Sequence, residues 1–193
     1  MLSNLTSDDW CTLVMCTVYE GAIQMRVGLV SKDAAKVHLK SLSDQDRYTR
    51  FCTNIKDDQI DKYVDSAKGV FYGVFCVGDN WVDRCVCLMH FVPDHKSKEA
   101  EIALSTLPDY RGNGYAKKLL TGGIFMANAY LMEKVVMSGL SSNKAIVVLA
   151  KSCGLEVEHE CGEFMGERGT AVSLFNTLAE NNIKMFKILC WNS

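Results

Sequence analysis

The sequence has no excess of positive charge and no hydrophobic run long enough for a membrane. Its 193 residues contain 21 Lys and Arg against 23 Asp and Glu, which gives a formal net charge of −2. A protein that binds nucleic acid by neutralising phosphates carries an excess of basic residues, so this balance argues against nucleic-acid binding. No Lys or Arg precedes Arg26, and the apolar residues 11–18 are too few to cross a bilayer. We therefore expect a cytoplasmic protein with neither a secretion signal nor a membrane anchor.

The cysteines lack the spacing of a metal or redox site. There are nine of them, no Cys-x-x-Cys pair occurs, and the four histidines do not cluster with them in the sequence. Most of these cysteines lie in apolar patterns, where Cys serves as a small core residue. We expect reduced thiols in a reducing compartment and no bound metal. With 48% hydrophobic and 23% charged residues, a chain of this length forms one globular domain with its own core.

Hydrophobic patterns predict a succession of strands and helices. Strands are expected over residues 24–30, 70–77, 81–92, 99–107, 134–140, 155–161 and 170–175, with a hairpin turn at residues 78–80. Helices are expected over residues 32–42, 46–52, 57–67, from the turn after residue 107 to about Met132, over 143–153, and from Thr177. Hairpins followed by a β-α-β-α-β half imply an α/β (α+β) fold: a mixed, mostly antiparallel central sheet with helices on both faces.

The first residues stand apart from this pattern. Ser7 and Asp8 are suited to cap a short helix that ends at Gly21. We assign residues 1–22 to an N-terminal extension, either a family-specific addition or a contact in a homodimer. Residues 23–193 then form the main domain.

The turn after the predicted strand 99–107 is the most informative segment. Gly112 and Gly114 remove side chains that would keep an anion away, and Arg111 adds a positive charge. The helix that follows presents unpaired backbone N–H groups and the positive end of its dipole to this turn. These features predict a binding site for a phosphate or pyrophosphate.

Two better-known phosphate loops do not fit the turn. A nucleotide P-loop requires Gly-Lys followed by Ser or Thr, whereas Tyr115 follows Gly114. A dinucleotide fingerprint requires a small residue at its third glycine position, which is Lys117 here. The remaining pattern is Arg-x-x-Gly-x-Ala, formed by Arg111, Gly114 and Ala116, with Pro-x-Tyr ahead and Leu-Leu behind. It resembles the cofactor loop of the GNAT superfamily of acyl-CoA-dependent N-acyltransferases.

Three further segments resemble this superfamily, in the right order along the chain. Residues 143–155 start at Asn143 and end in Gly-Leu, similar to the second cofactor element with Leu in place of Phe. Residues 43–51 (SDQDRYTRF) are similar to the Ser-x-x-Ser/Asp-Arg-Tyr-x-Arg-Phe run of the branch that includes bacterial protein-lysine acetyltransferases. Residues 100–103 (AEIA) are similar to the Ala-Glu-x-Ala strand of that branch. The resemblance covers roughly residues 24–175, and it implies acetyl-CoA as cosubstrate and a primary amine as acetyl acceptor.

The resemblance assigns a general base to this chain. An amine like that of lysine has a pKa near 10.4 and is protonated at pH 7, so a positioned base is useful. Glu101 is the candidate, acting directly or through a water molecule. We expect partial burial to raise its pKa. Glu99, two residues earlier on the same face of the strand, is the alternative.

The resemblance also implies which residues contact the cofactor. Leu104 and Thr106 would pair with the pantetheine arm, and the N–H near Leu104 would donate to the thioester oxygen. The pyrophosphate would be held by the turn, which consists of Arg111, Gly112, Asn113, Gly114, Tyr115 and Ala116. Asn143 would bind the cofactor arm through its side-chain amide, or serve as a plain helix cap.

One feature departs from the superfamily pattern. Many members carry a Tyr seven residues after this Asn, as the acid that protonates the leaving thiolate, and this chain has Ala150 there. A thiol with a pKa of about 8.5 gives a thiolate that leaves without an acid. The general acid therefore stays unassigned.

The acceptor site is expected between the helices after the first strand and a loop over residues 162–169. Acidic residues flank both sides, and they either attract a cationic acceptor or form solvated faces: Asp57, Asp58, Asp61, Asp65, Glu160, Glu163 and Glu167. The residues Arg47, Tyr48, Arg50 and Phe51 are expected to pack the helices on the sheet. Three functions stay open: acetylation of a protein lysine or N-terminus, acetylation of a small amine, and binding of acyl-CoA without catalysis.

Overall fold

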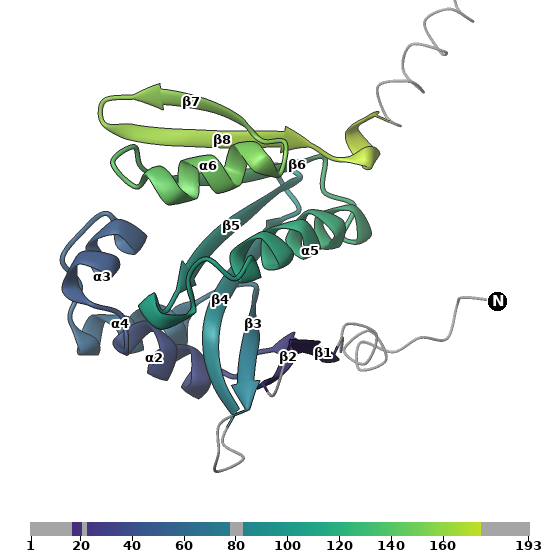
Figure 1. Ribbon diagram of the computed structural model, residues 1–193. Helices are drawn as coiled ribbons and strands as arrows, with labels where there is room; N and C mark the ends of the chain where they lie inside the picture. The colour runs from purple at the N-terminus through teal and green to yellow at the C-terminus, as the bar shows by residue number, and fades with distance from the viewer. Residues whose placement is uncertain (1–16, 21–22, 78–82, 175–193) are drawn as a thin grey trace, which may run out of the picture.

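The computed structural model describes residues 17–20, 23–77 and 83–174. The described residues form one sheet with the strand order β1-β2-β3-β4-β5-β6-β8-β7 (Figure 1). All neighbouring strands are antiparallel except β5 and β6, which are parallel. The strands are β1 Thr17–Glu20, β2 Ile23–Leu29, β3 Val70–Val77, β4 Asp83–Asp94, β5 Glu99–Thr106, β6 Lys134–Leu140, β7 Glu156–Glu160 and β8 Glu163–Gly169. The mixed, mostly antiparallel sheet expected from the sequence is confirmed.

Helices cover both faces of this sheet, as expected. They are α2 Lys32–Lys40, α3 Asp44–Phe51, α4 Asp57–Ser66, α5 Tyr115–Ala129 and α6 Lys144–Ser152, with a short 3-10 helix, η1, at Pro108–Tyr110. Buried residues of α2 and α4 share one hydrophobic cluster with β3 and β4, and we call this side the α4 face. Buried residues of α5 and α6 share the other cluster, on the α5 face. Ser31 and Ser43 accept backbone N–H bonds at the starts of α2 and α3, so local sequence determines where these helices begin.

A glycine brings α5 close to the sheet. A Cβ at Gly123 would lie 2.7 Å from Cδ1 of Ile102 and 2.9 Å from Sδ of Met89, so no larger residue fits without displacement. Leu120, one turn of the helix before this, is fully buried in the same cluster. Close packing of α5 on β4 and β5 holds the N-terminus of α5 at the end of β5, where the phosphate turn (residues 111–116) lies.

The described cysteines are free thiols. Burial raises the pKa of both Cys85 and Cys87 to about 12, so these two β4 residues are protonated core side chains at neutral pH.

Three predicted elements are wrong. Residues 17–20, expected in a helix that ends at Gly21, form β1, which pairs with β2 at the edge of the sheet. Residues 162–169, expected as a loop of the acceptor site, include strand β8, which pairs with both β6 and β7. Residues 171–174, expected in the last strand, are helical, and the Thr170 hydroxyl accepts the N–H of Ser173 at their start.

The strand β8 was missed because its inward positions carry little apolar signal. Phe164 and Gly166 are its buried residues, and the others are exposed. A Cβ at Gly166 would contact Leu155, Val157 and Ala150 at 3.4–3.7 Å, so only a small residue fits comfortably there. The predicted hairpin turn at 78–80, most of the N-terminal helix and the helix from Thr177 lie outside the described residues.

Candidate active site

The two parallel strands at the centre of the sheet separate after three residue pairs. β5 and β6 pair only over Glu99–Glu101 and Lys134–Val136. Beyond that point β5 stays with β4 and β6 stays with β8, so a gap opens between them. A cleft of about 1040 Å³ occupies the gap, lined by α3 and α4 on one face of the sheet and by the phosphate turn and α6 on the other. The cleft thus joins the two faces.

The edge of β5 that faces the gap has free backbone groups. The N–H of Leu107 donates to the Val86 carbonyl on β4 at 2.9 Å. Backbone direction alternates along a strand, so the N–H groups of Leu104 and Thr106 point the other way, into the gap. Arg111 Nε, which donates to the Thr106 carbonyl at 3.3 Å, lies on this side as well. Both strand residues predicted to contact the cofactor therefore line the cleft and direct their backbone N–H groups into it.

The phosphate turn has the geometry of an anion site. Gly112 and Gly114 have φ of 81° and 75°, the left-handed region that favours glycine, and a Cβ on either would meet nothing within 4 Å. The backbone N–H groups of residues 112, 113, 114, 116 and 117 donate to no other described residue. These donors lie at the N-terminus of the fifteen-residue helix α5, where the helix dipole is positive. The turn thus fits a pyrophosphate group.

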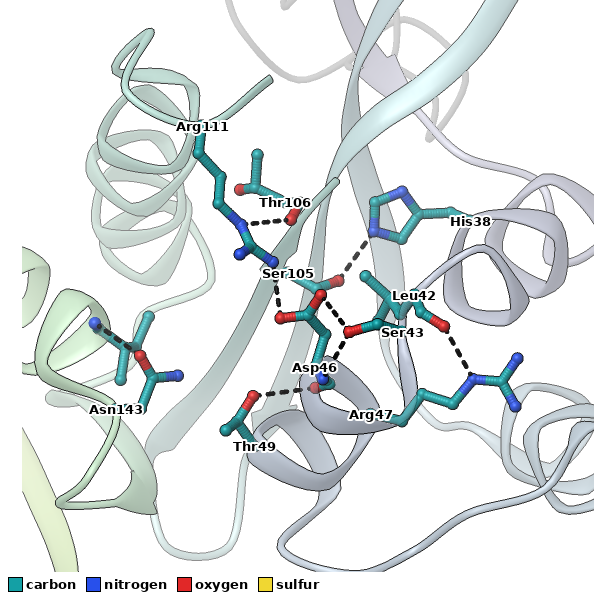
Figure 2. A network of polar contacts seen from close by, with 11 residues as sticks. His38, Leu42, Ser43, Asp46, Arg47, Thr49, Ser105, Thr106, Arg111 and Asn143 are labelled. Atoms are coloured by element: carbon teal, nitrogen blue, oxygen red, sulfur yellow. Dashed lines mark hydrogen bonds and ion pairs between the residues drawn. The ribbon is translucent and has the colours of Figure 1, made fainter. Parts of the chain in front are cut away.

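The side chain of Arg111 forms an ion pair outside the phosphate turn. Its Nη2 lies 2.7 Å from Oδ1 of Asp46 on α3 (Figure 2), and both residues line the cleft. Asp46 is held in turn by the hydroxyl of Ser43, which donates to Oδ2 at 2.8 Å. The positive charge predicted for the phosphate is therefore partly neutralised, and it ties α3 to the turn.

Other residues of the turn contribute mainly backbone. The Asn113 side chain donates to the Tyr110 carbonyl at 3.2 Å. The Tyr115 side chain is buried, while Ala116 is half-buried and lines the cleft. None of these side chains is required for the anion site, which is consistent with binding through N–H groups.

Asn143 is a helix cap that also lines the cleft. Its Oδ1 accepts the N–H of Ile146 at 3.4 Å, as Figure 2 shows, so the capping alternative is confirmed. The side-chain NH₂ stays available, and its bond to the cofactor arm stays a prediction. Ala150 is fully buried near Gly166 and does not line the cleft, whereas Leu149 does. An acid at position 150 would therefore lie in the core rather than beside a leaving thiolate.

Glu101 and Glu99 have different surroundings. Glu101 lines the cleft on the α4 face, because Ala100 and Ile102 on either side of it are buried on the α5 face. Glu99 is held by Lys134 at 2.8 Å, which also contacts Glu167. Glu101, the preferred candidate for the base, thus lines the cleft, whereas the alternative, Glu99, is held in an ion pair outside it. The expected partial burial of Glu101 is wrong: its side chain is exposed, because β5 leaves β6 at this position.

Beside Glu101 lies a chain of hydrogen bonds that sequence reasoning missed. His90 Nε2 is 2.7 Å from the Lys68 carbonyl, so Nε2 carries the proton and donates. Nδ1 then accepts from the hydroxyl of Tyr63 at 2.7 Å, and the Tyr63 oxygen accepts from Arg50 Nη2 at 3.1 Å. Burial lowers the pKa of His90, which keeps the ring neutral. We call Arg50, Tyr63, His90 and Glu101 the polar cluster.

A second buried histidine supports the same wall. His38 Nδ1 lies 2.9 Å from the Cys85 carbonyl and donates to it, so Nε2 accepts from the hydroxyl of Ser105, also at 2.9 Å. Ser105 lines the cleft two residues after Ala103 (Figure 2). Burial lowers the pKa of His38 from 6.5 to about 4. This neutral ring joins α2 to β4 and β5.

The acidic residues of α4 are paired with cations. Their partners are Arg47 for Asp57, Lys62 for Asp58, Lys40 for Asp61 and Lys36 for Asp65, at 2.7–3.7 Å. The solvated-face interpretation therefore fits better than attraction of a cationic acceptor. Arg47 also donates to the carbonyls of Lys40 and Leu42, as a packing residue does.

The described residues contain neither a cluster of metal ligands nor a membrane-crossing helix. Within these residues, no three His, Cys, Asp or Glu side chains are grouped so that they could hold a metal ion. None of the helices described combines the length and the hydropathy that crossing a membrane requires.

Comparisons of the whole fold identify its type. The GNAT domain of S. lividans PAT superposes with a TM-score of 0.61 at 16% identity, over 76% of this chain and 90% of that domain. A spermidine N-acetyltransferase from Vibrio cholerae in complex with CoA and spermine gives 0.59 at 13% identity, over 78% and 98%. The chain has the GNAT acyltransferase fold.

A third GNAT-fold neighbour is named for an acceptor other than spermidine. It is a ribosomal-protein-S5-alanine acetyltransferase from Vibrio fischeri, with a TM-score of 0.58 at 11% identity, over 81% of this chain and 97% of that one. No family model matches the sequence, and no curated protein does. Similarity is therefore seen in the fold, and the identities are too low to transfer an acceptor.

Proposed function

We propose that this protein is an N-acetyltransferase that moves the acetyl group of acetyl-CoA to a primary amine by direct attack. The observation that carries the proposal is the meeting of three features at one cleft. These are the anion-binding turn at the start of α5, the free edge of β5 with the Leu104 N–H, and the exposed carboxylate of Glu101. The GNAT-fold neighbour that holds CoA supports acetyl-CoA as the cosubstrate.

In this proposal the residues of the α5 face bind the cosubstrate. Acetyl-CoA supplies an activated thioester. The N–H groups of residues 112, 113, 114 and 116 hold its pyrophosphate, and those of Leu104 and Thr106 pair with the pantetheine arm. As the amine attacks, the C–N bond forms and negative charge develops on the thioester oxygen, to which the Leu104 N–H donates. The C–S bond then breaks, and CoA leaves as the thiolate without an acid.

In this proposal, residues on the α4 face bind and deprotonate the amine. Glu101 accepts a proton from the ammonium form or from the attacking nitrogen, directly or through a water molecule. Its exposure lets an acceptor approach from the side of α3 and α4. Glu99 is less suited to this role because Lys134 already pairs with its carboxylate.

Two acceptor classes are supported by different observations. The resemblance of residues 43–51 and 100–103 to the protein-lysine acetyltransferase branch supports a polypeptide amine, either a lysine or an N-terminus. A small amine is the second candidate, and the opposite charges of Arg50 and Glu101 in the polar cluster favour it. A binding module without catalysis is disfavoured because an exposed carboxylate faces the cleft beside the cofactor site.

Calorimetric titration of the protein with acetyl-CoA tests the cofactor site, with NADH and ATP as control ligands. We expect micromolar, selective binding of acetyl-CoA. Gly114→Val should weaken it by ~10-fold or more, because a branched side chain is strained at φ 75° and fills the turn. The matched control is Gly122→Val, on the exposed side of α5, where a Cβ also meets nothing within 4 Å.

Two results would contradict this placement. Equal binding of NADH or ATP would mean that the turn serves another nucleotide. Equal affinity of the two glycine variants for acetyl-CoA would mean that the pyrophosphate lies elsewhere.

A further inference from the structure

The charges that face the amine side of the cleft are few and of both signs. On the α4 face, the acidic and basic side chains that line the cleft are Asp46, Arg50, His90 and Glu101. Asp46 is paired with Arg111. His90 is neutral, with both ring nitrogens hydrogen-bonded. Among the described residues of this face, that leaves one cation, Arg50, and one anion, Glu101, at neutral pH.

Arg50 has donors left for a ligand. Its Nη2 bonds the Tyr63 hydroxyl, and its guanidinium lies 4.9 Å from the Phe51 ring centre and 5.9 Å from that of Tyr63. No carboxylate in the described part of the chain forms an ion pair with it. Cation–π contacts with the two rings and the bond to the Tyr63 hydroxyl hold the guanidinium in place, which prepares it for a carboxylate.

Arg50 and Glu101 both act on one ring. His90 is separated from Arg50 by a single residue, Tyr63, through two hydrogen bonds. Glu101 is close on the other side, because His90 pairs with Ala103 in the β4–β5 register and Glu101 lies two residues before it on the same face. The charges of Arg50 and Glu101 shift the His90 pKa in opposite directions. The cation Arg50 and the anion Glu101 thus lie on two sides of one ring in the cleft.

Building on the proposed acetyl transfer, we propose that Arg50 binds a carboxylate of the acceptor, and that the acceptor is a small amine of the amino-acid class. Glu101 faces the amine, and Arg50 faces a carboxylate on the same or a neighbouring carbon. Polyamines fit poorly, because their second ammonium meets the Arg50 charge. A lysine side chain in a polypeptide carries no carboxylate so close to its amine.

The test compares amino acids with their own carboxamides. The amide lacks the negative charge, and its α-amine is less basic and so more often deprotonated at pH 7 to 8. The amide is therefore the more reactive amine of each pair. A higher kcat/KM for the acid can come only from recognition of its carboxylate by the protein. CoA release with acetyl-CoA is measured for each pair, alongside spermidine and a lysine peptide with a blocked N-terminus. We expect at least one amino acid to exceed its amide in kcat/KM by about tenfold or more.

Variants separate recognition from packing. Arg50→Gln should abolish the preference of the acid over the amide, mainly through KM, and Arg50→Lys should restore it in part. Tyr63→Phe removes the hydrogen bond between Arg50 and the Tyr63 hydroxyl but keeps the guanidinium. It should therefore change kcat/KM for an amino acid and for its amide by the same factor. Lys62→Gln removes a positive charge from the exposed side of α4 and should leave the preference unchanged.

Each contrary outcome has a distinct meaning. Turnover of the peptide or spermidine with no preference for any acid over its amide would overturn the carboxylate site and leave acetyl transfer intact. The carboxylate site would also be overturned if Arg50→Gln kept the preference for the acid over the amide. The same holds if Tyr63→Phe lost this preference as completely as Arg50→Gln does. If acetyl-CoA is bound but no amine in the panel is acetylated, the proposed function fails, and this inference fails with it.

Discussion

The two sides of the cleft use different chemistry. On the α5 face, the phosphate turn offers backbone N–H groups that donate to no other described residue. On the α4 face, side chains satisfy one another through the chains Arg50–Tyr63–His90 and Ser105–His38, which end on backbone carbonyls. The first side is a local structure made by glycines and a helix start. The second is assembled from α2, α3, α4, β4 and β5.

This difference separates binding from specificity. An anion site made of backbone N–H groups, like the phosphate turn, needs few particular side chains. It therefore suits a cosubstrate shared by many proteins of one fold. The α4 face contains charges and hydrogen bonds that would select an acceptor. The three predictions that follow test whether these roles can be separated by mutation.

The largest effect is expected at Glu101. Glu101→Gln should lower turnover at least ~100-fold with little change in acetyl-CoA affinity, because it removes the proposed base and leaves the phosphate turn unchanged. Steady-state kinetics and calorimetry measure the two quantities. Glu99→Gln is the matched control and should keep most activity, since Lys134 holds that carboxylate outside the cleft. Near-normal turnover in Glu101→Gln would remove this residue from the mechanism.

The next effect concerns the stability of the α4 face. His38 has a pKa of about 4 when folded and 6.5 when unfolded. Between these values the unfolded chain binds a proton that the folded protein does not, so stability is fully present above pH 6.5 and falls as pH drops towards 4. By pH 5 the loss from this residue is about 2 kcal/mol.

Urea unfolding at pH 7.5 and pH 5.0 measures this loss. His38→Gln should show a smaller decrease between the two pH values than the unchanged protein does. His159→Gln, whose side chain is exposed, should follow the unchanged protein. The same decrease in all three proteins would mean that the His38 ring is protonated as easily in the folded state as in the unfolded chain.

The contrast between the two sides also explains what the sequence could predict. Most strands and helices follow from local patterns, and residues 70–77 and 134–140 match their predicted bounds. The phosphate turn was predicted because two glycines, a strand end and a helix start lie within a few adjacent residues. In contrast, Tyr63 contacts His90 across 27 residues, and His38 contacts Ser105 across 67. No local pattern marks such pairs.

The errors have the same origin. β8 escaped prediction because Gly166, one of its two inward positions, is small to fit against Ala150 and Leu155, and glycine gives no hydrophobic signal. Glu101 was expected to be partly buried, but the early separation of β5 and β6 exposes it. Both errors depend on packing between distant segments. The ion pair of Arg111 with Asp46, 65 residues away, could not be foreseen from the motif either, and contact of Arg111 with the phosphate stays a prediction.

The smallest effect is expected where the two sides touch, at the ion pair of Arg111 and Asp46. Both side chains are partly exposed, so a double-mutant cycle of Asp46→Asn and Arg111→Gln should give a coupling energy in unfolding below about 1 kcal/mol. Asp46→Asn alone should tighten acetyl-CoA binding by about threefold or less, because it frees a positive charge beside the phosphate turn. Calorimetry at low and high salt measures this gain, which added salt should reduce. Weaker binding in Asp46→Asn would mean that Asp46 positions the turn through Arg111, so that the two sides of the cleft are coupled rather than separate.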